Sequence, residues 1–289
     1  MSASRSRSLM AVEIFNRQAV ITVGTLRLEG YRVTFKIRKT LEREPNTCEV
    51  QIFNLSAKNR AAVGELTPSK GAKRGIPVKI EGGYETTGGP QLLWLGDLRT
   101  SLSYKEGPTW VTSLSSGDGE KAQQTSRMGQ SFGPRTPIAT ILKAIVGALG
   151  IGEGNISRFL GESAGNTGRT AFSGVVLQGS AAYHLDNWTR AIGASWSVQD
   201  GELQLLKDGT TATGRSVLLS PPTGLIGVPV VEADGNLSVT SFILPDVDIG
   251  GVVVVKSESV EGNFRIDQAE WVGDTRGQDW YVSIKGPRF

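Results

Sequence analysis

The chain has very little thiol and very little imidazole. Its 289 residues include one cysteine, Cys48, and one histidine, His184. A disulfide framework needs pairs of cysteines, and zinc sites draw most of their ligands from cysteine and histidine, so we expect neither within one chain. A nucleophile–histidine–acid triad would have to use His184, which has no serine or cysteine motif around it. We therefore predict a packed or surface histidine, no metal and no cofactor.

Long apolar runs are also lacking. The longest, IATILKAIVGALG over residues 138–150, contains Lys143 and is too short to cross a bilayer. The first residues, MSASRSRSLMAVEIF, hold no apolar core long enough for a signal peptide. The sequence therefore predicts a soluble protein without a membrane-spanning segment, made in a cytoplasm.

Charge of one sign is not in large excess. Lysine and arginine number 31 and aspartate and glutamate 28, spread along the chain, which is weak evidence for nucleic-acid binding. Aromatic residues are few, at 7%, whereas the 37 glycines are about twice the usual share. Many glycines without low-complexity repeats indicate numerous tight turns, which are typical of β-rich domains.

Alternating patterns divide the chain into parts. In YRVTFKIRK the apolar Tyr31, Val33, Phe35 and Ile37 alternate with polar or basic residues, which predicts a half-buried strand. The basic side could be a solvated face, or a face that meets an acidic partner or a DNA-filled channel. Further strands follow up to about residue 118, with one short helix that begins after Ser56.

The middle of the chain shows helical spacing instead. Thr136 and Pro137 read as a helix N-cap and first-turn proline, apolar residues recur to Leu149, and Gly150 marks the end. A second helix should begin after Ser180 and end at Gly193. The Asp200–Gly201 pair in SWSVQDGELQLL is a strong hairpin signal, in which Trp196 and Val198 would face Leu203 and Leu205.

Strand patterns return after the polar loop KDGTTATGRS. We predict a mainly β protein with four parts: a flexible arm over 1–9, a β domain over 10–118, a mixed α/β unit over 119–212 and a second β domain over 213–289. The two β domains share no visible sequence identity.

Paired carboxylates are the remaining route to catalysis. Asp118 with Glu120, and Asp246 with Asp248, could be pairs, but each lies in a glycine- or proline-flanked turn, where acidic residues are common for backbone reasons. We therefore expect no enzyme. A cell-wall hydrolase or a glycan-binding module is the alternative.

Several stretches together resemble the baseplate hub protein of contractile-tailed bacteriophages. They are LEREPNTCEVQIFNLS, LLWLGDLRTSLSYKEGPTWVT, SLSSGDGEK, LLSPPTGLIGVP and GDTRGQDWYVSI, spread from about residue 12 to 286. The resemblance implies two tail-tube-like antiparallel β-barrel domains that flank the α/β unit. It also implies a structural role in the virion, as a trimeric ring between the tail tube and the central spike.

The same resemblance implies the partners. They are further copies of the chain in a homotrimer, the tail tube protein, the central spike protein and other baseplate proteins, with transient passage of DNA through the lumen. No catalytic, metal-binding or cofactor-binding residue is implied. Any lytic activity would come from another protein.

The most specific stretch, GDTRGQDWY, is interpreted as a structural turn or a subunit interface. Its glycines permit a tight backbone, Asp274 can accept hydrogen bonds from turn amides, and Arg276 can reach a carboxylate such as Asp279. Trp280 should begin a strand whose alternate residues face the core. The candidate residues are Gly273, Asp274, Arg276, Gly277, Gln278, Asp279, Trp280 and Tyr281.

Overall fold

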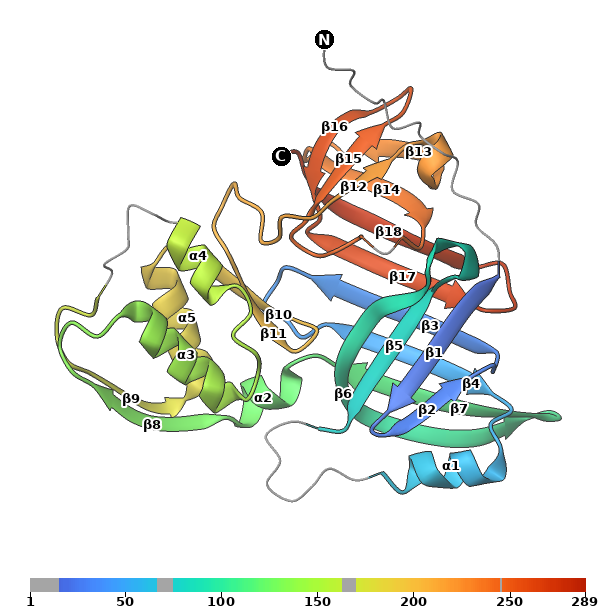
Figure 1. The fold of residues 1–289 in the computed structure, drawn as a ribbon, viewed down its shortest axis with the longest axis horizontal. Helices are drawn as coiled ribbons and strands as arrows, with labels where there is room; N and C mark the ends of the chain where they lie inside the picture. Colours follow the sequence, from blue (N-terminus) through green and yellow to red (C-terminus); the bar gives the residue numbers. More distant parts are fainter. Residues whose placement is uncertain (1–15, 67–74, 163–169, 245) are drawn as a thin grey trace, which may run out of the picture.

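The computed structural model describes residues 16–66, 75–162, 170–244 and 246–289. The predicted arm over 1–9 lies outside the described residues. The fold is mainly β, as predicted, and its largest element is an eleven-stranded sheet that takes strands from both ends of the chain (Figure 1). Its order is β13-β14-β18-β17-β3-β4-β7-β6-β5-β1-β2. The strands are β1 (Arg17–Val23), β2 (Leu26–Glu29), β3 (Val33–Thr40), β4 (Thr47–Phe53), β5 (Pro77–Tyr84), β6 (Gly89–Glu106), β7 (Thr109–Gly117), β13 (Leu225–Val231), β14 (Asn236–Phe242), β17 (Gln268–Asp274) and β18 (Trp280–Pro287).

Eight neighbouring strands of this sheet form two blocks with the same order. In the N-terminal block the order is β3-β4-β7-β6, and in the C-terminal block it is β13-β14-β18-β17. Each block thus consists of two hairpins, and the last strand of the second hairpin pairs with the last strand of the first. The blocks join where β17 pairs antiparallel with β3, from Gln268 opposite Thr40 to Asp274 opposite Thr34. Without visible sequence identity, the chain nevertheless repeats one strand order.

The pairing differs from the two predicted barrels. Among the described residues no closed barrel is found, because the two β parts share one open sheet through β17 and β3. The alternating patterns correctly identify which side of a strand is buried: Val33, Phe35 and Ile37 are buried. Alternation carries no information about which distant strand is the neighbour, so the shared sheet was not predicted.

A single apolar core supports both β parts. Buried residues from β1, β3, β4 and β5 pack with those of β14, β17 and β18. The C-terminal part adds a three-stranded sheet of β12 (Ser216–Leu219), β15 (Val252–Lys256) and β16 (Glu261–Arg265), in which β12 and β15 run parallel. The remaining elements are α1 (Ala57–Gly64) and the short 3-10 helices η1 (Glu85–Thr87) and η2 (Pro221–Thr223).

The middle of the chain has its own core, which lies to one side of the sheet (Figure 1). Helices α3 and α5 pack beside the predicted β10–β11 hairpin, where Trp196 is opposite Leu205 and Val198 opposite Leu203. The elements are α2 (Glu120–Thr125), β8 (Arg127–Phe132), α3 (Ile138–Leu149), α4 (Ile156–Glu162), β9 (Val175–Ser180), α5 (Ala181–Ala191), β10 (Ser195–Gln199) and β11 (Glu202–Leu206).

The helix ends follow the sequence signals closely. The side chains of Ser56 and Ser180 accept the capping hydrogen bonds of α1 and α5, and Gly150 ends α3 in the left-handed conformation. The prediction for Thr136 is wrong by one position. Pro137 occupies the cap with an extended ψ of 137°, and the Thr136 hydroxyl donates to the Gly133 carbonyl instead.

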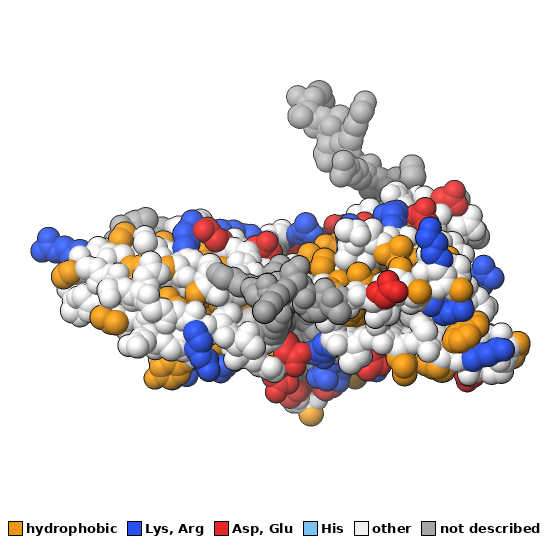
Figure 2. All heavy atoms as spheres, turned by 90° about the horizontal axis from the view of Figure 1, so that it is seen from below, with side chains coloured by type: hydrophobic (Ala, Val, Ile, Leu, Met, Phe, Trp, Pro, Cys, Tyr) orange, Lys and Arg blue, Asp and Glu red, His pale blue; other side chains and the backbone are white. Residues whose placement is uncertain are grey.

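The face of the molecule drawn in Figure 2 gives no strong electrostatic signal. On the face drawn in Figure 2, basic and acidic side chains lie interspersed over the slab formed by the α/β unit and the β parts. Among the described helices, none is both long and apolar enough to cross a membrane.

Candidate assembly site

The segment GDTRGQDWY forms the loop between β17 and β18 and the ends of both strands. Its backbone caps the start of β3: the Thr275 amide donates to the Val33 carbonyl at 3.0 Å, and the Thr275 hydroxyl accepts from the Val33 amide at 3.0 Å. Arg17, at the start of β1, donates to the Gly277 carbonyl at 2.8 Å. The loop therefore fastens the C-terminal block to the first strands of the chain.

Asp274 is the electrostatic centre of this loop. Arg32 donates to both of its carboxylate oxygens, from Nη2 at 2.7 Å and from Nε at 3.3 Å, and the Arg276 amide donates at 2.9 Å. The Arg32 hydrogen bond lowers the pKa of the Asp274 carboxyl, and the amides of Arg276 and Gly277 act in the same direction.

The prediction that Arg276 contacts the Asp279 carboxylate is wrong. The structure records no such contact between these two described residues, and the Asp279 carbonyl accepts the Asp274 amide at 2.7 Å instead. The guanidinium that meets a carboxylate in this loop belongs to Arg32, 242 residues away from Asp274. Local sequence could identify the acceptor but not so distant a donor.

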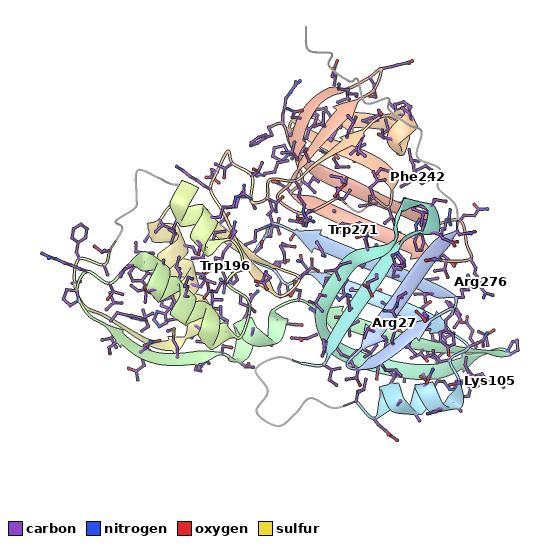
Figure 3. The ribbon with its side chains drawn as sticks, in the orientation of Figure 1. Arg27, Lys105, Trp196, Phe242, Trp271 and Arg276 are labelled. Atoms are coloured by element: carbon purple, nitrogen blue, oxygen red, sulfur yellow. The ribbon has the colours of Figure 1, made fainter. Side chains whose placement is uncertain are left out.

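Neighbouring side chains lie so close to Gly273 and Gly277 that neither position has room for a Cβ atom. A Cβ at Gly273 would overlap the ring of Phe35, and one at Gly277 would overlap the Asp274 carboxylate. Arg276, Gly277, Gln278 and Asp279 are exposed at the edge of the molecule, where Figure 3 shows Arg276. Trp280 is buried and Tyr281 half-buried.

Two strands of the blocks each have a side on which the described residues place no paired strand, although helix α1 also contacts β6. Residues 100–106 of β6 pair with β7 on one side, but the partner strand on the other side, β5, ends its pairing at Asp97. This half of β6 forms a projecting hairpin with β7, and Lys105 lies at its tip (Figure 3). β13 pairs only with β14 among the described strands. The Pro229 carbonyl of β13 already accepts the Ser259 hydroxyl at 3.4 Å. Main-chain groups on an edge that has no paired strand can take further main-chain hydrogen bonds.

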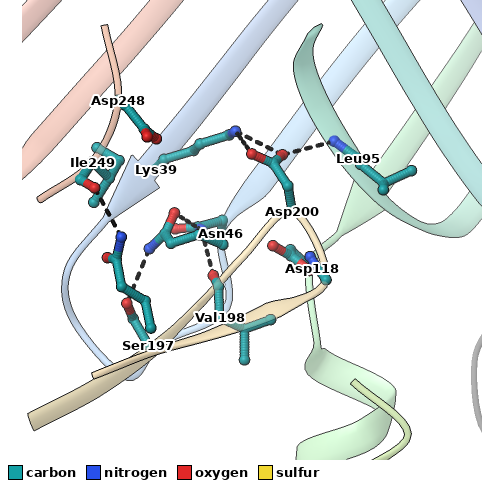
Figure 4. Close-up of polar contacts among 12 residues, drawn as sticks. Lys39, Asn46, Leu95, Asp118, Ser197, Val198, Asp200, Asp248 and Ile249 are labelled. Atoms are coloured by element: carbon teal, nitrogen blue, oxygen red, sulfur yellow. Dashed lines mark hydrogen bonds and ion pairs between the residues drawn. The ribbon is translucent and has the colours of Figure 1, made fainter. Parts of the chain in front are cut away.

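A buried ion pair lies where the three parts of the chain meet (Figure 4). Lys39 of β3 contacts both carboxylate oxygens of Asp200, at 2.7 and 2.6 Å, and its side chain is only 7% exposed. Asp200 also accepts the Leu95 amide of β6 at 2.9 Å. Because Asp200 is at the turn of the β10–β11 hairpin, these bonds hold the α/β unit against the N-terminal block.

Further hydrogen bonds fix the same hairpin. Asn46 donates to the carbonyl of Val198 and to the side chain of Gln199, both at 2.9 Å. Asp118, which is fully buried, accepts the Gly201 amide at 3.0 Å. The sequence marks the turn itself, but no local signal shows that it inserts between the other parts.

A polar pocket of about 460 Å³ adjoins this junction. Lys39, Asp200, Gln204, Arg215 and Asp248 contribute to its lining. Burial raises the pKa of the Asp248 carboxyl, against the opposing effect of Lys39 and Arg215. The described residues form no group of three or more metal-ligating side chains.

The residues considered for catalysis have structural partners. His184 Nε2 lies 3.0 Å from the Gln178 carbonyl, and Cys48 is buried, which raises the pKa of its thiol well above the ordinary value. Glu120 pairs with Arg99 at 2.5 Å. Asp248 lies 3.8 Å from Arg215. Asp118, Glu120 and Asp248, three of the four suggested carboxylates, thus each have a separate partner.

Comparison with known proteins identifies one family. The family model described as Baseplate hub gp41 matches residues 17–286. No curated protein matches the sequence significantly.

Solved structures are similar in fold. A 43 kDa tail protein of prophage MuSo2 from Shewanella oneidensis has a TM-score of 0.63 at 14% identity, covering 95% of this chain and 98% of that one. A tail protein from Neisseria meningitidis has a TM-score of 0.61 at 9% identity, covering 94% and 96%. The E. coli c3393 protein, a type VI secretion component similar to the phage T4 tail proteins gp27 and gp5, has a TM-score of 0.57 at 9% identity, covering 93% and 76%.

Proposed function

Because this chain belongs to the Baseplate hub gp41 family, a family of phage-tail structural proteins, we propose that three copies of it form a ring that connects the tail tube to the central spike. The ring is part of the virion, in the baseplate, and the chain is made in the host cytoplasm. The tail tube protein binds one side of the ring, the spike protein the other, and further baseplate proteins bind its periphery.

The observation that carries this proposal is the repeated strand order. Each chain holds two blocks, β3-β4-β7-β6 and β13-β14-β18-β17, with one topology. Three chains then present six quasi-equivalent β units, which would match a tube of six subunits. The two blocks take the part of the two tube-like domains, with the α/β unit between them in sequence and outside them in space (Figure 1).

The side of the blocks away from the core is suited to line a lumen. It carries mainly hydroxyl, amide and charged side chains, among them Thr34, Gln51 and Ser113. Its basic residues are partly neutralised, because Lys36 of β3 lies 3.2 Å from Glu270 of β17. A polar surface of mixed charge would let DNA pass without tight binding, since tight binding needs an excess of positive charge. The basic side of β3 is therefore better explained as lumen than as a DNA-binding site.

The ring makes a direct prediction about stoichiometry. In isolated, assembled tails, reconstruction of the tube's distal end without imposed symmetry should show three copies of this chain, each contributing two β units. The tube itself, reconstructed from the same particles with its six-fold repeat, is the internal control. Six copies of the chain at that level, or one β unit per chain in the ring, would contradict the proposal.

We also expect no hydrolytic activity of its own. The carboxylates that could form an acid/base pair are engaged or separated: Glu120 binds Arg99, and Asp118 accepts a backbone amide. The purified full chain should therefore leave a peptidoglycan suspension as turbid as buffer does, while lysozyme clears it. Clearing by the wild type that disappears in Glu120→Gln or Asp246→Asn would show that the chain is an enzyme.

A further inference from the structure

We infer that the ring closes by main-chain pairing between β13 of one copy and residues 100–106 of β6 in the next, with Tyr104 opposite Val230. The inference rests on the proposed trimer and names the surface that joins its subunits. The occupant of each free edge is thus a second copy of this chain.

The pairing of β17 with β3 inside the chain is the model for this contact. β3 and β13 are the first strands of the two blocks in the order given above, and β6 and β17 are the last. The C-terminal block is joined to the N-terminal block by an end-to-end seam, β17 with β3. The equivalent seam from the N-terminal block would join β6 to a β13, and the β13 of the same chain lies at the far end of the sheet.

Strand direction is consistent with closure. All neighbours among the eight strands of the two blocks pair antiparallel. With an even number of alternating strands, the two outermost strands run in opposite directions. Joined between copies, β6 and β13 are therefore antiparallel, like every other pair in the blocks. A head-to-tail contact of two different edges is also the type of interface that closes a ring.

The two blocks can be aligned residue by residue. β4 and β14 have seven residues each, and they end in Phe53 and Phe242. Phe53 pairs with Val111 of β7, which in turn pairs with Tyr104 of β6. In the C-terminal block, Phe242 pairs with Tyr281 of β18, which in turn pairs with Val272 of β17. Tyr104 and Val272 therefore hold equivalent positions.

The other side of the seam is aligned in the same way. The third residues of β4 and β14 are Glu49 and Ser238. They pair with Lys36 of β3 and Val230 of β13, respectively, so Lys36 and Val230 hold equivalent positions.

The register of the contact between copies follows from the register of the β17–β3 seam. Val272 lies opposite Lys36 in the β17–β3 seam. Their equivalents, Tyr104 and Val230, should therefore face each other across the contact between copies. An aromatic residue opposite a β-branched one is a favourable cross-strand pair.

Exposed apolar side chains support the same two edges. Among the described residues of the eight strands, the exposed large apolar side chains lie on β6 and β13, apart from Trp110 of β7. They are Leu102 and Tyr104 on the part of β6 beyond its pairing with β5, Val228, Val230 and Val231 on β13, and Leu92 on the part of β6 that pairs with β5. Isolated exposed residues need no explanation, but the concentration of five of these six on two strand edges indicates contact surfaces.

Val231 shows most clearly that a neighbour is missing. It pairs with Leu237, which is fully buried, so both side chains point to the core side of the sheet. Val231 is nevertheless 44% exposed, because no further strand covers it. On the opposite side of the sheet, Leu102 is 63% exposed for the same reason. A strand of a second copy would cover both.

The test is a cysteine cross-link between copies in assembled tails. Chains with Tyr104→Cys are mixed with chains with Val230→Cys, assembled into tails and oxidised. Directly opposite strand residues lie within the Cα separation that a disulfide spans. Cys48 is buried and does not compete. We expect covalent dimers from the mixture, and closed covalent trimers from tails in which every chain carries both substitutions.

The matched control is Lys105→Cys with Val230→Cys. Lys105 is the neighbour of Tyr104 and points to the other side of β6, so this pair should give at least tenfold less dimer. Tails that contain three copies but yield no cross-link, or equal cross-linking with the Lys105 control, would overturn the inference and leave the proposed ring intact. Tails without three copies would overturn the proposed function itself. Each chain of the mixture carries a single exposed substitution, so folding does not decide the result.

Discussion

Asp200→Asn should destabilise the protein by roughly 2–4 kcal/mol, because it removes the carboxylate that contacts the buried ammonium of Lys39. Removing one partner of a buried pair typically costs about 3–5 kcal/mol, and the lower range applies here because the Asp200 side chain is 26% exposed. Asparagine is chosen because residue 200 has a φ of 53°, a left-handed conformation that asparagine tolerates and alanine does not. Scanning calorimetry of the full chain would measure the loss.

The matched control removes both charges. Lys39 lies 6.0 Å from the ring centre of Trp94 and 5.6 Å from that of Trp271, so a methionine at position 39 would lie beside two indole rings. Lys39→Met combined with Asp200→Asn should therefore recover a large part of the stability lost in Asp200→Asn alone. Equal melting of Asp200→Asn and wild type would show that the pair is solvated and does not hold the α/β unit.

This ion pair also marks the limit of what the sequence could predict. The Asp200–Gly201 turn was predicted, since both residues favour the positive φ that such a hairpin needs, and Gly201 has a φ of 82°. Its partner Lys39 is 161 residues away, and the alternation of its strand made no prediction about its contacts. Local patterns report a residue's own conformation and burial. They do not report which distant side chain it meets.

The same distinction explains the missed strand. β13 was not predicted, because Gly227 and Pro229 interrupt its alternation, and a proline usually argues against a central strand. In the structure β13 is an outermost strand with an irregular register between Ile226 and Val230, where a proline is tolerated. Its composition therefore fits an edge, and recognising an edge required the strand order.

The candidate loop shows both outcomes within a few residues. Alternation correctly indicated that Trp280, Val282 and Ile284 face the core, and all three are buried. Asp274 accepts a turn amide as expected, whereas its ion pair with Arg32 depends on the β17–β3 seam. The strands and caps, which depend on near neighbours in sequence, were thus predictable. The seam, which assigns the loop a role between the two blocks, was not.

Trp280→Ala should lower the stability by about 3–5 kcal/mol, the usual loss when a buried aromatic side chain is truncated. Trp280 is 1% exposed, and its ring makes edge contacts with Phe35, at 5.4 Å between ring centres, and with Tyr84, at 6.2 Å. The contact with Phe35 joins β18 of one block to β3 of the other, and the contact with Tyr84 joins β18 to β5. The cavity would therefore open beneath the seam itself, and the midpoint of thermal unfolding should fall by roughly 6 °C or more.

Two substitutions make this loss interpretable. Trp280→Phe keeps a ring in the site and removes an indole N–H that has no hydrogen-bond partner among the described residues, so it should cost clearly less than alanine. Phe172→Ala removes a fully exposed aromatic ring and should leave the melting temperature unchanged. If Trp280→Ala melts with the Phe172→Ala control, within about a degree of wild type, then the indole does not support the seam. The two blocks would in that case be held together by the β17–β3 hydrogen bonds and the Arg32–Asp274 pair, which the substitution leaves in place.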